Sequence, residues 1–171
     1  MRQGVLVLPL LGTLAAASIP LITFAQKSRA EASAVDLLHR LDRAQQAFRL
    51  ATGAGYASSL RSIVTGCPVA AAAGQQPTEV LSEFDGPYRL SLRAATSARV
   101  VGTDCHGQPI VSEYYASAEP AWTDPRGQKA FAMLSGSGVW VFFDGVAPLE
   151  ADMGPGGLAT RLEALDSFRI P

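Results

Sequence analysis

Hydrophobic and polar positions divide the first third of the chain into two parts. No charged residue lies between Gly4 and Ala25, and about 20 consecutive apolar residues can cross the hydrocarbon core of a bilayer as a helix. Because a backbone in lipid must satisfy its own hydrogen bonds, we expect residues 1–25 to form the transmembrane half of a helix. Pro9 and Pro20 each lack a backbone donor and are expected to kink this helix without ending it.

Two simpler interpretations of residues 1–25 remain open. A basic start, an apolar core and Thr23-Phe24-Ala25 before Gln26 also fit a secretory signal peptide that is removed after Ala25. The segment fits a plain single-span anchor as well. The residues that follow favour a different interpretation, because the helical pattern continues beyond Ala25.

Residues 26–53 are predicted to continue the helix as its amphipathic half. They contain no proline and no glycine before Gly53, and most of them are good helix formers. Apolar residues recur at alternating intervals of four and three, which places them on one helical face. This stripe consists of Ala30, Ala34, Leu37, Leu41, Ala44, Phe48 and Ala51. Asp36 and Arg40 lie on the opposite side at the spacing of an ion pair. We therefore expect one continuous helix of about 48 residues, roughly 70 Å long.

The period of the pattern changes in the second half of the chain. Residues 54–85 are expected to form a connecting loop region with a short helical segment at 56–64. Apolar and polar residues alternate from Tyr88 to Arg93, as expected for a half-buried strand. Further strands are expected at 98–105, 110–118, 129–134 and 139–143, which completes a β-sheet head over residues 86–145. Residues 146–171 are rich in glycine and proline and are expected to form an irregular tail.

These elements predict the α+β fold class, with one long N-terminal helix packed on a small antiparallel β-sheet. The first half of the helix is expected to span a membrane, and the stripe of the second half is expected to cover one face of the sheet. The chain has 171 residues, and removing the first 25 leaves roughly 145, enough for one hydrophobic core. Its net charge of −1 argues against a basic surface for nucleic acid.

The chain contains two cysteines, Cys67 and Cys105. If this part of the chain is exported, an oxidising compartment favours a disulfide between them. If the chain stays in the cytosol, the two thiols are expected to remain reduced.

The sequence contains no cluster of residues that predicts catalysis. Asp104, Cys105 and His106 are adjacent, but neighbouring residues on a strand point to opposite faces, so Cys105 and His106 cannot act as nucleophile and base. One cysteine, one histidine and scattered acids are too few for a zinc site. Gly136 and Gly138 are not followed by the residues of a phosphate-binding loop. We expect no enzyme activity, no cofactor and no metal, although a triad assembled from distant residues stays open.

The apolar segment also contains a recognisable order of small and apolar residues. Gly12, Leu14, Ala15, Ala16 and Pro20 form a Gly-x-Leu-Ala-Ala-x-x-x-Pro segment. Downstream, Ala44-Gln45 precedes Phe48, and Gly55-Tyr56-Ala57 follows the helix. In this order and spacing, the first third of the chain resembles the type IV pilins and the pseudopilins of type II secretion.

The resemblance implies a structural subunit of a type IV pilus or a type II secretion pseudopilus that polymerises through its N-terminal helix. Small residues such as Gly12, Ala15 and Ala16 would let neighbouring helices approach closely. Leu37, Leu41 and Phe48 would hold the helix on its head.

The resemblance also implies a location and partners. The location would be a single-pass protein of the bacterial inner membrane, with its head in the periplasm, and then an extracellular or periplasmic filament. The partners would be other pilin-like subunits, the inner membrane and the assembly machinery. The alternative is a membrane-anchored or secreted extracytoplasmic binding domain that does not polymerise.

One feature of the family concerns residues near the start of the chain. Family members carry a basic leader that ends in glycine, then a methylated residue and a nearby acidic residue. Alignment on Gly12 and Pro20 places that acidic position at Gln3. We therefore expect either a leader encoded upstream of Met1 or a degenerate relative that is not cleaved.

Overall fold

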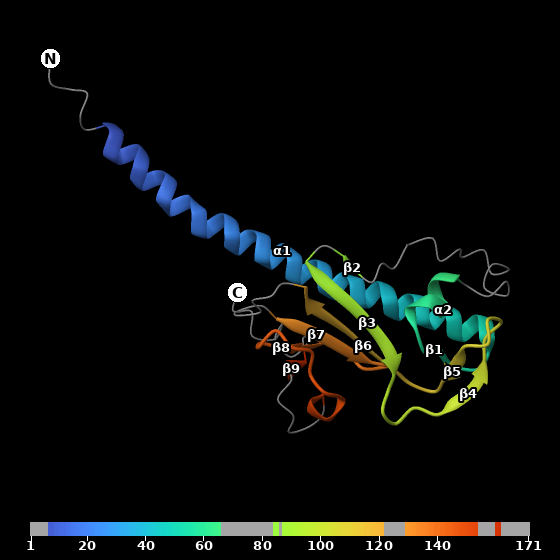
Figure 1. Cartoon of the computed structure of the whole chain (residues 1–171). Helices are drawn as coiled ribbons and strands as arrows, with labels where there is room; N and C mark the ends of the chain where they lie inside the picture. The colour runs from blue at the N-terminus through green and yellow to red at the C-terminus, as the bar shows by residue number, and fades with distance from the viewer. Residues whose placement is uncertain (1–6, 66–83, 86, 122–128, 154–159, 162–171) are drawn as a thin grey trace, which may run out of the picture.

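The computed structural model describes residues 7–65, 84–85, 87–121, 129–153 and 160–161, and it describes side chains for residues 26–65, 87–121 and 129–153. The elements in chain order are α1 (Val7–Thr52), β1 (Tyr56–Ala57), α2 (Leu60–Thr65), β2 (Phe84–Asp85), β3 (Tyr88–Ala94), β4 (Val100–Thr103), β5 (Pro109–Val111), β6 (Tyr114–Pro120), β7 (Ala130–Leu134), β8 (Trp140–Phe142), the 3₁₀ helix η1 (Glu150–Asp152) and β9 (Thr160–Arg161). Figure 1 shows the C-terminal half of α1 lying along the strands. We call the strands, α2 and η1 together the head.

Helix α1 is continuous over 46 residues. It ends at Gly53, which adopts a left-handed φ of +66° that residues with a Cβ atom rarely adopt. The Gly53 N–H donates to the Arg49 carbonyl at 2.9 Å, which satisfies one carbonyl of the last turn. On the exposed side of α1, the predicted ion pair between Asp36 and Arg40 is confirmed at 3.1 Å.

The membrane-spanning part of the predicted fold class is wrong. Among the residues that the structure describes, no helix is long and apolar enough to cross a membrane. The described side chains of α1 begin at Gln26 and include Lys27, Arg29 and Glu31, and charged side chains are costly at the centre of a bilayer. The same finding contradicts the predicted location as a single-pass protein of the inner membrane.

The predicted single sheet is also wrong, because the nine strands of the described residues form two antiparallel sheets. One sheet has the order β1-β5-β4, and the other has the order β2-β3-β6-β7-β8-β9. The predicted strand over residues 110–118 is in fact β5 and β6, which belong to different sheets. Between them, the Ser112 N–H donates to the Arg99 carbonyl at 2.9 Å and the Ala95 N–H donates to the Glu113 carbonyl at 3.2 Å. The chain therefore leaves one sheet after Val111 and enters the other at Tyr114.

The first sheet brings its backbone very close to the segment that follows α1. A Cβ atom on Gly55 would lie 2.4 Å from the Val111 carbonyl oxygen and 2.9 Å from a methyl group of Val101. Only glycine fits at this position without displacing the backbone of β5. Tyr56 and Ala57 then pair with Val111 and Ile110.

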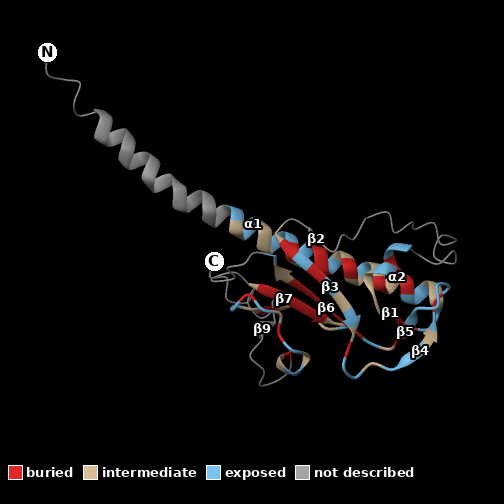
Figure 2. Ribbon diagram, in the orientation of Figure 1, coloured by how far each residue is buried: buried red, intermediate tan, exposed pale blue. Residues whose placement is uncertain are grey.

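One hydrophobic core fills the space between α1 and both sheets. Leu37, Leu38 and Leu41 are at most 2% exposed, and Phe48 is also buried. Residues of β1, β3, β5, β6, β7 and β8 belong to the same buried cluster. Figure 2 shows buried residues along α1 where it faces the strands, and exposed residues on its other side. The stripe predicted from the sequence thus coincides with the buried face of α1.

Candidate functional site

Polar contacts from α1 reach both sheets within the core, and we call them the helix–sheet contact. The side-chain amide of Gln45 donates to the Ala57 carbonyl at 2.9 Å, and its oxygen accepts from the Ala57 N–H at 2.9 Å. Gln45 therefore pairs with β1 as a neighbouring strand would. The Tyr114 hydroxyl of β6 donates to Asp42 Oδ1 at 2.6 Å. One turn of α1 is thus bonded to both sheets.

Aromatic rings extend this contact towards the end of α1. The Arg49 guanidinium lies 5.3 Å from the centroid of the Tyr56 ring, and its Nη1 donates to the Tyr56 hydroxyl at 3.0 Å. The rings of Tyr56 and Tyr114 meet edge to face with centroids 5.1 Å apart. Such pairs contribute about 0.5–1.5 kcal/mol beyond the area that they bury.

At the other end of the contact, an ion pair connects α1 to the start of β7. Lys129 Nζ lies 2.8 Å from Glu31 Oε2, and the side chain of Glu31 is only 13% exposed. The Tyr88 hydroxyl donates to the Lys129 carbonyl at 2.9 Å. Burial and the nearby Glu31 carboxylate raise the pKa of Tyr88 to about 12. Burial and the bond to Asp42 likewise raise the pKa of Tyr114 far above its ordinary value.

The residues predicted for packing and assembly have different places in this structure. Leu37, Leu41 and Phe48 lie in the core beneath the helix–sheet contact. The assembly residues lie within α1, but their side chains are outside the described residues; they are Gly12, Leu14, Ala15, Ala16 and Pro20. The sequence analysis did not assign a role to Gln45. Its position between Leu41 and Phe48 places a polar amide on the apolar face of the helix, and this could have indicated a buried hydrogen bond.

The predicted disulfide can be followed at one of its two cysteines. Cys105 is disulfide-bonded, and no free cysteine occurs among the residues that the structure describes. Its predicted partner, Cys67, lies outside the described residues. The neighbouring Asp104 forms a turn, because its Oδ1 accepts from the backbone N–H groups of His106 at 2.9 Å and Gln108 at 2.7 Å. Burial opposes ionisation of Asp104, but these bonds keep its pKa below the ordinary value.

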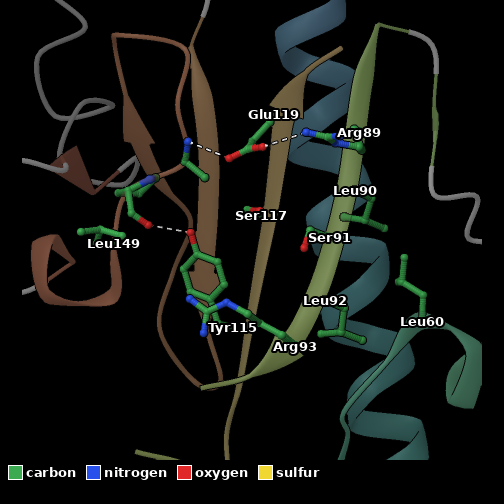
Figure 3. Close-up of a pocket in the computed structure, with 12 residues that line it drawn as sticks. Leu60, Arg89, Leu90, Ser91, Leu92, Arg93, Tyr115, Ser117, Glu119 and Leu149 are labelled. Atoms are coloured by element: carbon green, nitrogen blue, oxygen red, sulfur yellow. Dashed lines mark hydrogen bonds and ion pairs between the residues drawn. The ribbon is translucent and has the colours of Figure 1, made fainter. Parts of the chain in front are cut away.

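A second feature is a depression of about 550 Å³ on the face of the larger sheet that α1 does not cover. Alternate residues of β3 point towards this face, which carries Arg89, Ser91 and Arg93 beside Ser117 of β6 (Figure 3). The segment around Pro148 forms one wall. We call this feature the outer depression.

The charged groups of the outer depression are already paired with one another. Arg89 lies 3.5 Å from Glu119, whose other oxygen accepts from the Ala147 N–H at 3.1 Å (Figure 3). Arg93 pairs with Glu150, and its guanidinium lies 4.2 Å from the centroid of the Tyr115 ring. Both arginines of the outer depression are therefore held in place by carboxylates.

Hydrogen bonds fix the wall of the outer depression. The Tyr115 hydroxyl donates to the Pro148 carbonyl at 2.6 Å, and burial raises the pKa of Tyr115 to about 12. Burial opposes ionisation of Glu150, yet the Thr96 N–H at 2.6 Å and the Arg93 guanidinium hold its pKa below the ordinary value. The depression is therefore a fixed polar surface.

The described side chains contain no group of three or more His, Cys, Asp or Glu residues that could hold a metal ion.

Comparisons with known proteins add no relative, because no family model, no curated protein and no solved structure matches this chain.

Proposed function

We propose that this protein is a structural subunit of a filament of the type IV pilin and pseudopilin class, and that copies associate through the first half of α1. The observation that supports this proposal is the division of α1 into two parts. Ala34, Leu37, Leu38, Leu41 and Phe48 of the second half are buried against the head, whereas the sequence of the first half carries no charge from Gly4 to Ala25.

The uncharged, largely apolar segment at the start of the chain requires other apolar groups around it. A helix that is apolar on all sides is stable only when other apolar groups surround it, and burial contributes about 0.8 kcal/mol for each CH₂ group. The same segment in neighbouring copies supplies such groups. Gly12, Ala15 and Ala16 are small and would let two helices approach closely.

The head supports this assignment in a second way. The helix–sheet contact fixes the second half of α1 on the head through four side chains, Glu31, Asp42, Gln45 and Arg49. The orientation of the helix relative to the head is therefore fixed. A fixed orientation lets every copy present its helix in the same way, which a helical polymer requires.

Assembly of the purified full chain tests the proposal. Sedimentation velocity and electron microscopy should detect long polymers of the unmodified chain, and Ala16→Glu should abolish them, because it places a charge among packed apolar helices. The thermal midpoint of the head should stay unchanged. Ala32→Glu is the matched control, because Ala32 is exposed on α1, and this variant should still assemble.

Two outcomes would contradict the proposal. One is an unmodified chain that stays monomeric at every concentration tested, which would favour the non-polymerising binding domain. The other is an Ala16→Glu variant that assembles as well as Ala32→Glu does.

A further inference from the structure

Five of the seven large apolar side chains that are exposed among the described residues lie in two short segments of the head. Val100 and Val101 of β4 are 68% and 45% exposed. Phe143, Val146 and Leu149, which follow β8, are 55%, 56% and 69% exposed. We call residues 99–101 the β4 patch and residues 143–149 the turn patch. Single exposed apolar residues are ordinary, but several of them within a few residues of one another make a segment a candidate for contact with a partner.

The two patches lie on different parts of the head and cannot meet within one molecule. Strand β4 is an edge of the smaller sheet, at the end of the head where α1 finishes (Figure 1). Strand β8 belongs to the larger sheet and lies towards the opposite end (Figure 1). The two patches therefore do not cover each other within one molecule.

The charged residues within the two patches, one in each, are opposite in sign. Arg99 is exposed at the start of the β4 patch, and no ion pair joins it to any described residue. Asp144 is exposed in the turn patch, where its Oδ1 accepts from the Val146 N–H at 3.0 Å. Two other charges beside the patches already have partners. Lys129, over the Phe143 ring, pairs with Glu31, and Glu113 accepts from the Ser97 hydroxyl.

The geometry of β4 favours contact through side chains. The pairing of β4 with β5 shifts between Val100 and Gly102, which is the signature of a β-bulge. Bulges at sheet edges hinder the addition of another strand. The exposed valines and Arg99 are therefore the groups that a partner would touch.

We propose that the β4 patch of one copy binds the turn patch of the next copy, with Arg99 facing Asp144 across the contact. Because the two surfaces differ, the contact is heterologous, and its repetition generates an open polymer when the rotation between copies does not close a ring. This inference rests on the proposed function, since it assigns the head contacts of the same filament. The apolar groups supply affinity, and the opposite charges select the orientation.

Cross-linking of the full chain tests the contact directly. Val100→Cys and Val146→Cys are made as separate variants, mixed, and treated with a short bismaleimide. The mixture should give at least tenfold more covalent dimer than either variant alone, because only the mixture places one introduced thiol in each patch of a shared contact. The unmodified chain with the same reagent gives the background.

Charge reversal tests the orientation of the contact. Arg99→Glu and Asp144→Arg should each raise the dissociation constant of the contact between copies about tenfold, which corresponds to about 1.4 kcal/mol. A mixture of the two variants should recover part of that loss, because one of its interfaces has both charges exchanged. Arg61→Glu is the matched control at an exposed arginine of α2 and should have no effect.

The outcomes separate this inference from the proposed function. Filaments that form without any cross-link between the thiols introduced in the two patches, and that tolerate both charge reversals, would overturn the inference and leave the filament proposal standing. A specific cross-link in a chain that forms no filaments would support the inference and contradict the filament proposal. Absence of both would overturn both.

Discussion

Gln45 provides the sharpest test of how α1 is held on the head. Its buried amide satisfies both the N–H and the carbonyl of Ala57 at 2.9 Å. Gln45→Leu keeps a similar volume but leaves both backbone groups without a partner. Each unsatisfied buried group costs about 1–3 kcal/mol, so the free energy of unfolding should fall by about 2–6 kcal/mol. For a chain of this size the melting temperature should fall by roughly 5–20 °C.

Urea denaturation followed by circular dichroism measures this loss. Gln26→Leu is the matched control, because Gln26 is exposed on the same helix, and its effect should stay within about 0.5 kcal/mol. Equal stability of the two variants would refute the argument that Gln45 replaces a strand at β1.

Gln45→Glu adds a pH-dependent version of the same test. The introduced carboxyl can donate to the Ala57 carbonyl only when it is protonated, and burial favours the protonated form. Its pKa in the folded state therefore lies above the unfolded value of about 4.3. Below about pH 4.3 the variant should approach the stability of the unmodified chain. It should lose stability as the pH rises through the pKa that the carboxyl has in the folded state. A loss that is the same at pH 4 and pH 7 would contradict this reasoning.

Two further predictions concern groups in the head. Tyr88, Tyr114 and Tyr115 all have raised pKa values, so the folded protein at about pH 11 should ionise at most one of its four tyrosines, as measured by tyrosinate absorbance. Since the folded state disfavours these tyrosinates, stability should decrease as the pH rises above about 10, and ionisation of all four tyrosines before unfolding would refute the assignment. Cys105→Ser should lower the free energy of unfolding by roughly 2–5 kcal/mol, because it removes a disulfide. Thiol labelling of the unreduced, unmodified chain should find no free cysteine, and two labelled thiols would contradict the bond.

The buried face of α1 could be predicted because its signal is local and repeated. Ala34, Leu37, Leu41 and Phe48 follow the helical period, and all four are buried. The alternation in β3 was equally local, with Leu90 buried and Arg89 exposed. Periodicity identifies such elements without reference to the rest of the chain.

The division into two sheets could not be predicted in the same way. Ile110, Val111 and Tyr114 fit one continuous strand by composition. Only the pairing of Val111 with β1 and of Tyr114 with β3 separates them into β5 and β6. Strand β1 is a further example, because Tyr56 and Ala57 fit a helical segment by sequence. Their strand conformation depends on Ile110 and Val111 across the sheet and on Gln45 across the core.

The polar contacts of α1 explain why its position on the head is unique. An apolar stripe alone would keep an apolar face towards the sheets after a shift of one turn, although Ala44 would then occupy the site of Phe48. A shift of one turn would separate Gln45 from Ala57 and Asp42 from Tyr114, and it would leave buried polar groups without partners. The stripe therefore supplies most of the attraction, and the two polar contacts add to the selection of the register. This register determines which residues of α1 extend beyond the head. Gln45→Leu should therefore also weaken assembly, in proportion to the fraction of molecules in which α1 has shifted along the head.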